Sequence, residues 1–267
     1  MTALVIVIPA LNEAEALPAT LEAIASALDT PRPVVVADAG STDATASAAA
    51  AAGAAVVSAD RPDGGPAGRG AAMRAGVAAA LARHPDAEVL WLLHADTHPP
   101  IGADRLILDA LAAQPAAVAG AFRQRFATRH VGPWTRRKLH FIAMCNRLRY
   151  GLSGLYFGDQ GLFVRRASLE LIGGVPEAPL FEDVEMVRRL RGVGRVVLLP
   201  ARITTSPRRF VDAGVFRQGW RDLRLLVRHR LGLPLARQAA AYNAVNTDTT
   251  SSESEAGGSG GSAAGHG

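Results

Sequence analysis

The sequence predicts an α/β domain with a central, mostly parallel sheet flanked by helices. Through the first 113 residues, short runs of valine, isoleucine and leucine alternate with alanine-rich stretches. The runs are apolar at consecutive positions, which is typical of strands buried on both faces, and their alternation with helices indicates crossover connections. With 267 residues, of which 49% are hydrophobic and 20% charged, the chain has enough apolar material for one large domain.

In the first half of the chain, four strands are each followed by a helix. The strands are expected at residues 4–8, 34–37, 56–59 and 89–93. The helices are expected at residues 14–28, 42–52, 71–83 and 102–113. Ligands of such open sheets collect beyond the carboxyl ends of the strands. The residues directly after each strand are therefore the first candidates for a functional site.

The second half of the chain is less regular. Strands are expected at residues 118–126, 155–166 and 196–205, and helices at residues 134–150, 182–191 and 215–231. The polar segment GDQG at residues 158–161 is either a tight turn or part of a site. We divide the chain into a nucleotide-binding half over residues 1–115, a second half of the same domain over 116–245, and a tail over 246–267 that lacks apolar anchors and is expected to be disordered.

The net charge of +5 is distributed unevenly. Residues 1–100 carry five arginines and eleven acidic residues, whereas residues 101–267 carry 24 basic and 13 acidic residues. The second half is therefore expected to face an anion. Of the 29 basic residues 28 are arginine, which together with the alanine content fits genomic base composition, and no nucleic-acid partner is expected.

Cysteine content and the N-terminal sequence bear on the compartment. Cys145 is the single cysteine, which excludes an intramolecular disulfide and fits a reducing compartment. The first basic residue is Arg32, so the cationic start of a signal peptide is missing. The longest uncharged stretch, residues 44–59, is shorter than the about 20 apolar residues of a membrane span. We expect a cytoplasmic protein without a transmembrane helix.

The segment DAGSTD, from Asp38 to Asp43, follows the second strand. Ser41 or Thr42 can cap the next helix, which is the ordinary role of such a turn. Alternatively, Asp38 contacts a base or a ribose at the strand end.

The segment GGPAGRG, from Gly64 to Gly70, enters a helix. It is either a flexible loop or an anion cradle. Ala71 stands where a P-loop would have lysine, and Met73 stands where a dinucleotide-binding fingerprint would have glycine. Arg69 is a planar fork donor suited to a phosphate or a base edge.

The segment HADT at residues 94–97 ends the most apolar strand. Because alternate residues of a strand share a face, His94 and Asp96 can converge on one ion. A carboxylate favours Mg²⁺ or Mn²⁺, and an imidazole favours Mn²⁺ of the two. Alternatively, Asp96 caps the helix that follows Pro99 and Pro100.

An acidic turn opens the helix expected at residues 182–191. Acidic residues in a first turn complement the helix dipole, and Glu185 lies one turn before two arginines. The apolar approach over residues 179–181 also places Glu182 and Asp183 where a carboxylate can be partly desolvated and act as a base.

The helix expected at residues 215–231 is amphipathic. One stripe contains Phe216, Trp220, Leu223 and Val227, and a neighbouring stripe contains Arg217, Arg221, Arg224 and Arg228. With Trp134 and the basic residues 136–138 of another helix, these stripes fit either an anionic membrane surface or a packed helix with snorkelling arginines.

The order of these motifs resembles that of family 2 glycosyltransferases over residues 3–210. The similarity rests on VIPALNE at residues 7–13, DAGSTD at 38–43, GRG at 68–70, HADT at 94–97, GDQG at 158–161 and Glu182-Asp183. The HADT and GDQGLFVRR forms are similar to a bacterial subgroup of transferases associated with radical-SAM and selenodomain proteins. The resemblance implies a GT-A fold with a Rossmann-like sheet, a nucleotide-diphosphate sugar donor, Mn²⁺ or Mg²⁺, and inversion at the anomeric carbon.

The resemblance also implies a role for each matching residue. The base and ribose would be held by Pro9, Ala10, Asn12, Glu13 and Asp38. The rest of the nucleotide sugar would be held by Arg69, Gly70, His94 and Asp96. Asp96 matches the metal-binding last aspartate of the family's Asp-x-Asp motif, in which His94 replaces the first. Asp183 would be the catalytic base beside Glu182, and the acceptor side would include Asp159, Gln160, Arg208 and Arg209.

This assignment fits the chemistry of glycosyl transfer. An acceptor hydroxyl must lose a proton, and a general base such as Asp183 contributes about 10²–10⁴-fold to that step. The leaving diphosphate gains negative charge, which a metal on Asp96 and the arginines would meet.

Two alternatives remain open from the sequence. A sugar-phosphate nucleotidyltransferase shares a similar fold, but has a glycine- and arginine-rich loop where this chain has Pro9 to Asn12. The other alternative is a non-catalytic protein that binds nucleotide sugars or a membrane surface. The arginine-striped helix also fits an acceptor carried by a lipid and peripheral contact with the inner membrane face.

Overall fold

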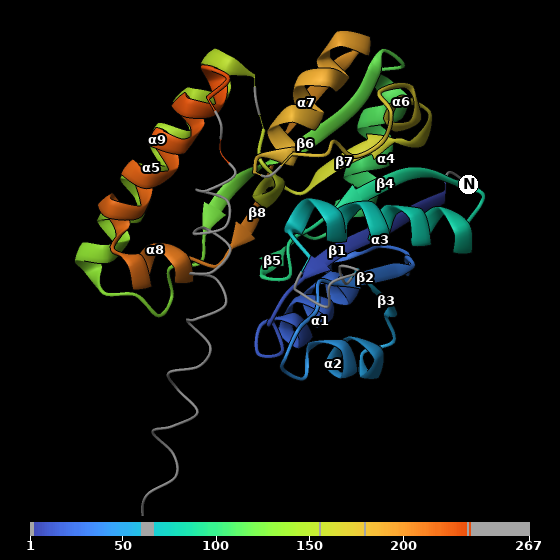
Figure 1. Ribbon diagram of the computed structural model, residues 1–267, viewed down its shortest axis with the longest axis horizontal. Helices are drawn as coiled ribbons and strands as arrows, with labels where there is room; N and C mark the ends of the chain where they lie inside the picture. The colour runs from blue at the N-terminus through green and yellow to red at the C-terminus, as the bar shows by residue number, and fades with distance from the viewer. Residues whose placement is uncertain (1–2, 60–66, 155, 179, 234, 236–267) are drawn as a thin grey trace, which may run out of the picture.

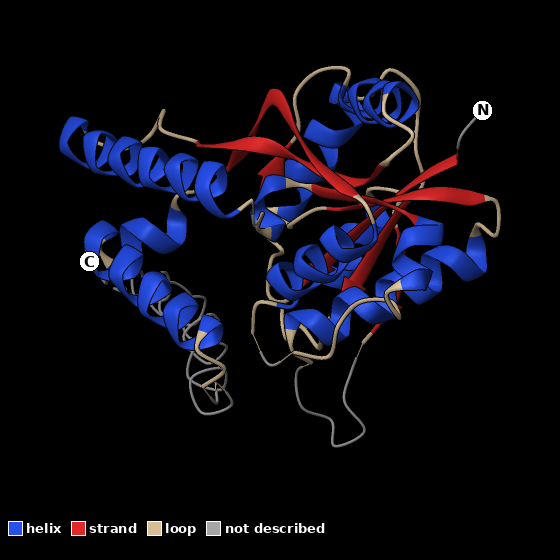
Figure 2. Cartoon of the chain, turned by 90° about the horizontal axis from the view of Figure 1, so that it is seen from above, coloured by secondary structure: helices blue, strands red, loops and turns tan. Residues whose placement is uncertain are grey.

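The computed structural model describes residues 3–59, 67–154, 156–178, 180–233 and 235. The tail over 246–267 and residues 64–66 of the glycine-rich loop lie outside the described residues. The described chain forms an eight-stranded mixed sheet in the order β3-β2-β1-β4-β7-β6-β8-β5. Helices cover both faces of this sheet (Figure 1 and Figure 2). The predicted α/β class is confirmed.

The N-terminal half follows the predicted alternation of strands and helices. The parallel strands are β1 (Ala3–Ala10), β2 (Val34–Asp38), β3 (Ala55–Ser58) and β4 (Ala87–Leu92). The helices are α1 (Leu17–Ala27), α2 (Thr45–Ala51), α3 (Arg69–Arg83) and α4 (Ala103–Ala113). A short strand that the sequence did not indicate, β5 (Thr97–His98), precedes α4.

Strand β1 shows why its residues are apolar at consecutive positions. Leu4, Ile6 and Ile8 lie in the core between the sheet and helices α1 and α4. Val5 and Val7 lie in the opposite core, against helices α3 and α7. Each such side chain contributes about 1.5–3 kcal/mol when fully buried, so both faces of the strand hold the fold together.

The C-terminal half completes the sheet with strands of both directions. Its elements are β6 (Ala117–Phe126), α5 (Pro133–Ser153), the 3-10 turn η1 (Gly158–Gln160), β7 (Leu162–Arg165), α6 (Arg166–Leu171), α7 (Glu182–Val193), β8 (Arg195–Thr205), α8 (Arg208–Ala213) and α9 (Val215–Arg230). Strand β7 lies antiparallel between β4 and β6, while β6 and β8 are parallel. The long strand expected at residues 155–166 is wrong, because Gly161 takes a φ of 61° that ends η1 and leaves four residues for β7.

Helices α5, α8 and α9 lie to one side of the sheet (Figure 1). The rings of Phe141 and Phe216 meet edge to face with centroids 6.2 Å apart, which joins α5 to α9. Within the described part of the chain, none of the helices combines the length and apolar character needed to cross a membrane.

Candidate active site

The carboxyl ends of β1, β2 and β4 meet at one edge of the sheet. Strand pairing places Pro9 beside Ala37 and Ala10 beside Asp38, and β4 lies on the other side of β1. The loop after β1 is therefore flanked by the DAGSTD and HADT segments. The sequence predicted this convergence because neighbouring parallel strands end at a common edge.

Asn12 connects the first two loops. Its backbone N–H donates to the Ser41 hydroxyl at 2.9 Å, and its side-chain oxygen accepts from the Thr42 N–H at 2.9 Å. Asp38 in turn accepts hydrogen bonds from the Ser41 N–H, at 3.2 Å, and from the Ser41 hydroxyl. Asn12 has a left-handed backbone, with φ at 52°, which asparagine tolerates better than most residues. These bonds fix the positions of Asn12 and Asp38 relative to each other.

The helix-capping role expected of Ser41 or Thr42 is not observed. The residue before α2 is Ala44, and no side chain caps the helix there. Asp43 instead accepts from the Thr45 N–H at 3.0 Å. The hydroxyl groups of Ser41 and Thr42 instead contact Asn12, at the junction between the two loops.

Glu13 and Asp96 face the start of α8. Arg208 donates to a Glu13 carboxylate oxygen at 2.8 Å and so links the two halves of the chain. Burial raises the pKa of Glu13 despite the opposing charge of Arg208. Burial likewise raises the pKa of Asp96, against the lowering influence of Arg208 and Arg209. The alternative that Asp96 caps a helix is wrong, since α4 begins after Gly102.

The acidic pair opens α7 at the centre of this region. Glu182 and Asp183 are 3% and 2% exposed. Asp183 accepts hydrogen bonds from the Gly158 N–H at 2.6 Å and from the Val184 N–H at 2.7 Å. Phe181, directly before the pair, has a φ of 61°, a conformation that costs energy in a bulky residue and is concentrated at functional sites. The carboxylate of Asp183 is therefore firmly oriented.

Arg69, the first residue of α3, joins the acidic pair to the HADT segment. Its Nε donates to Glu182 at 2.5 Å, and one terminal nitrogen lies 3.3 Å from Asp183. Its other terminal nitrogen lies 3.4 Å from His94 Nε2. Burial opposes the charge of Arg69, but Glu182 and Asp183 raise its pKa. The structure thus pairs Arg69 with the carboxylates, whereas the sequence predicted a nucleotide contact, which stays a prediction.

The surroundings of His94 favour its neutral form. Burial, together with the charges of Arg69 and Arg209, holds the pKa of His94 well below its usual range. A Cβ atom at Gly158 would lie 2.6 Å from His94 Nε2 and 3.1 Å from an Asp183 oxygen. The absence of a side chain at Gly158 allows the η1 turn to approach both residues.

The two central residues of the GDQG turn differ in their contacts. Asp159 accepts a hydrogen bond from Gln124 Nε2 at 2.7 Å. Gln160 is fully buried, and its amide bonds to the Phe122 carbonyl at 3.1 Å and the Phe157 N–H at 3.0 Å. Gln160 therefore holds the turn against β6, and the acceptor-side role expected of it stays a prediction.

Sequence reasoning missed Gln124 and Phe181. Gln124 is buried in β6 and also donates to the Thr205 hydroxyl at 3.0 Å. Gln124 stands between Arg123 and Arg125 in the second half of β6, so its residue type alone did not distinguish it. No pattern in the sequence indicates the backbone conformation of Phe181.

The carboxylates near the HADT segment suit a divalent metal that is shared with bound phosphates. Among the described residues, no three histidine, cysteine, aspartate or glutamate side chains are grouped to hold an ion. Mg²⁺ and similar ions are commonly held by one or two carboxylates together with substrate phosphates. Asp96, at the strand end beside the loop of β1, fits that kind of site.

A mostly parallel sheet with polar loops gathered at its carboxyl edge defines this chain as a GT-A fold. Residues 5–172, more than half of the chain, match the family model described as glycosyl transferase family 2. The chain belongs to this family. No protein with curated annotation matches the sequence.

Solved structures show the same fold. Glucosyl-3-phosphoglycerate synthase from Mycobacterium tuberculosis, crystallised with Mn²⁺ and UDP-glucose, is 20% identical with a TM-score of 0.56, over 87% of this chain and 80% of that one. The mannosyltransferase PcManGT from Pyrobaculum calidifontis, crystallised with GDP-mannose and Mn²⁺, is 22% identical with a TM-score of 0.53, over 75% of this chain. This chain spans 56% of that mannosyltransferase. S. aureus TarS 1–349 is 16% identical with a TM-score of 0.55, over 79% and 63% of the two chains.

Proposed function

We propose that the protein transfers a sugar from a nucleotide-diphosphate sugar to an acceptor hydroxyl, with inversion and with Asp183 as general base. The observation that carries this proposal is the fixed carboxylate of Asp183, held by two backbone N–H groups beside Arg69. A base must be oriented toward the proton it removes, and these bonds leave little freedom to the side chain. The motif forms also support membership of the radical-SAM-associated subgroup.

The donor would lie along the carboxyl edge of β1, β2 and β4. The loop from Pro9 to Glu13 and Asp38 would hold the base and ribose, and Asp96 would hold Mn²⁺ or Mg²⁺. The metal, when bound, supplies charge neutralisation for the leaving diphosphate. Arg208 and Arg209 place further positive charge beside Asp96, where the diphosphate develops negative charge. The complexes of the M. tuberculosis and P. calidifontis enzymes with Mn²⁺ and a nucleotide sugar support a donor and a metal of these kinds.

The first prediction separates binding from chemistry. Calorimetry should show that UDP or GDP binds the wild type with Mn²⁺ or Mg²⁺, and that EDTA or Asp96→Asn abolishes this binding. Asp183→Asn should retain nucleotide binding and lose about 10²–10⁴-fold in turnover of the matching nucleotide sugar, measured as nucleotide release. Unchanged turnover in that variant would exclude Asp183 as the base. Pyrophosphate release from a nucleoside triphosphate and a sugar phosphate would favour a nucleotidyltransferase instead.

We further propose peripheral contact with an anionic membrane, at the cytoplasmic face, and a lipid-linked acceptor. The apolar stripe of α9 is about half-exposed or more, because Phe216, Trp220, Leu223 and Val227 are 47–66% exposed. Helix α5 adds a second row of exposed apolar residues, at Trp134, Phe141, Met144 and Leu148. Aromatic and aliphatic rows beside arginines are typical of helices that lie in a membrane interface.

The second prediction tests this surface. The protein should sediment with anionic phosphatidylglycerol vesicles at low salt, and the combined change of Arg217, Arg221 and Arg224 to Glu should abolish sedimentation. Trp220→Ser should weaken it, whereas Leu171→Ser, on α6 and 71% exposed, should leave it unchanged. Equal sedimentation of all variants would contradict a membrane role for α9.

A further inference from the structure

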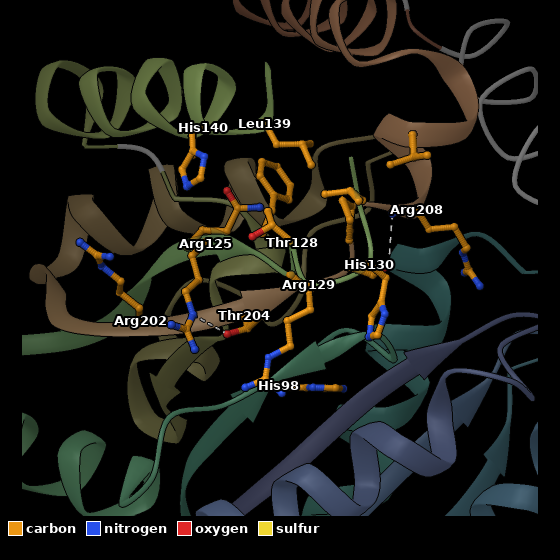
Figure 3. Close-up of a pocket in the computed structure, with 18 of the residues that line it drawn as sticks. His98, Arg125, Thr128, Arg129, His130, Leu139, His140, Arg202, Thr204 and Arg208 are labelled. Atoms are coloured by element: carbon orange, nitrogen blue, oxygen red, sulfur yellow. Dashed lines mark hydrogen bonds between the residues drawn. The ribbon is translucent and has the colours of Figure 1, made fainter. Parts of the chain in front are cut away.

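A pocket of about 1040 Å³ lies where α5 and α8 approach the last three strands of the sheet, β6, β8 and β5. Its walls are rich in basic side chains (Figure 3). Six of its 23 lining residues are arginine, against 28 arginines in all 267 residues. Three histidines also line it, and Asp212 is the only acidic residue among the residues that line the pocket. The arginine content of the whole chain therefore does not account for this concentration.

The arginines of this pocket are not explained by ion pairs within the protein. Within the described part of the chain, Arg208 alone among the six pairs with a carboxylate, that of Glu13. Arg125 donates to the neutral Thr204 hydroxyl at 2.7 Å. Arg123 and Arg202 are register partners on the adjacent parallel strands β6 and β8. Like charges on adjacent strands repel each other, and an anion bound between them would offset this repulsion.

The pocket adjoins the candidate active site. Gln124, in its wall, donates to Asp159 of the GDQG turn at 2.7 Å. Arg208, also in its wall, contacts Glu13 of the loop after β1. A molecule held in the pocket would therefore have one end beside the groups proposed to carry out the transfer.

We propose that this pocket binds the anionic end of the acceptor, and that this end is a phosphate group. The planar guanidinium fork matches phosphate oxygens with two parallel hydrogen bonds, and Arg125, Arg129 and Arg202 line the pocket from β6, from the loop after it and from β8 (Figure 3). The inference that the bound molecule is the acceptor rests on the proposed function, whereas the binding of a phosphate does not depend on it. The phosphate belongs either to a soluble ester or to a lipid headgroup.

The test compares two double variants of equal charge. Arg125→Gln with Arg202→Gln removes two charges from the pocket, and Arg83→Gln with Arg195→Gln removes two exposed charges elsewhere. Glycerol 3-phosphate is titrated calorimetrically in EDTA, and sedimentation is measured with vesicles of phosphatidic acid and of phosphatidylcholine. The pocket variant should weaken binding of one of these phosphates at least tenfold, and the control should match the wild type.

The probes distinguish the two sources. Arginine-dependent binding of glycerol 3-phosphate indicates a soluble ester, and arginine-dependent binding to phosphatidic acid vesicles alone indicates a lipid phosphate. If the pocket variant equals the control with both probes, the proposal is overturned. Metal-dependent binding of UDP or GDP is measured on the same variants. If neither the wild type nor either double variant binds these nucleotides, while phosphate binding still depends on the pocket arginines, the transferase assignment is overturned and the phosphate pocket stands.

Discussion

Gly158 is the point at which the GDQG turn comes closest to the reactive side chains. Its N–H donates to Asp183 at 2.6 Å, and no space remains for a Cβ beside His94. The same residue thus orients the proposed base and sets how closely η1 approaches the HADT segment.

The third prediction follows from this contact. Gly158→Ala should lower turnover about 100-fold, because the added methyl group displaces Asp183 or His94 by a fraction of an ångström or more. Nucleotide release from the donor and the melting temperature are the two measurements. Gly132→Ala, where a Cβ would meet nothing within 4 Å, is the matched control and should retain full turnover. Equal activity of the two variants would contradict this role of Gly158.

Among single residues, those after strands were predictable, whereas their partners were not. Asp38 could be identified because it directly follows an apolar run, and Asp96 because it lies in the HADT segment that follows another. Arg69 was recognised as an anion ligand, but its contact with Glu182 joins residues far apart in the chain. Only the packing of α3 against the start of α7 decides which anion it meets.

Helix α7 shows what one element contributes. Its first turn holds the acidic pair, and Glu185 accepts hydrogen bonds from both Arg188 and Arg189, at 2.7 and 2.8 Å. Hydrogen bonds from Arg188 and Arg189 lower the pKa of Glu185 from 4.5 to about 2, although burial acts to raise it. A pKa lowered in the folded state stabilises the fold above pH 4.5, and this contribution is lost as the pH falls toward 2.

The fourth prediction is that Glu185→Gln lowers the free energy of unfolding by about 1 kcal/mol at pH 7, since both arginine partners are largely exposed to solvent. The difference from the wild type should shrink between pH 5 and pH 3, as measured by urea unfolding. Glu22→Gln, at an exposed position of α1, should show no such pH dependence. A difference that stays constant with pH would rule out the ion pairs as its source.

Elements followed the sequence wherever hydrophobic content alone defined them. The strands β1, β2 and β4 lie within a few residues of the predicted runs, because a strand buried on both faces must be apolar throughout. The long strand expected at residues 155–166 was wrong, since the polar residues Gly158–Gln160 form a turn and only Leu162–Arg165 form a strand. The pairing of β7 between β4 and β6 depends on contacts between distant segments.

A buried ion pair joins two parts of the molecule that are distant in sequence, helix α4 and the segment between α1 and β2. Asp104 is 1% exposed and accepts from Arg32 at 3.0 Å and from the Asp29 N–H at 2.9 Å. Although burial acts to raise it, these hydrogen bonds lower the pKa of Asp104. The pair therefore stabilises the native protein at neutral pH, and acid weakens it.

The fifth prediction is that Asp104→Asn lowers the free energy of unfolding by about 3 kcal/mol at pH 7, because it leaves the Arg32 charge buried without a counter-charge. Urea unfolding followed by circular dichroism measures the change. Asp109→Asn, exposed on the same helix, should change the stability by less than about 0.5 kcal/mol. A loss as small as that of the control would show that the pair contributes little.

The sequence by itself determined the α/β class, the order of the N-terminal elements and the positions of the polar loops after β1, β2 and β4. These features depend on residues that are neighbours in the chain, through apolar runs and the turns that follow them. The tertiary structure decided that Arg69 meets Glu182 and Asp183, that Arg208 meets Glu13, that the stripe of α9 is exposed, and that arginines from β6, β8 and α5 line one pocket. Those features depend on how segments distant in the chain pack together, which hydrophobic patterns along it do not specify.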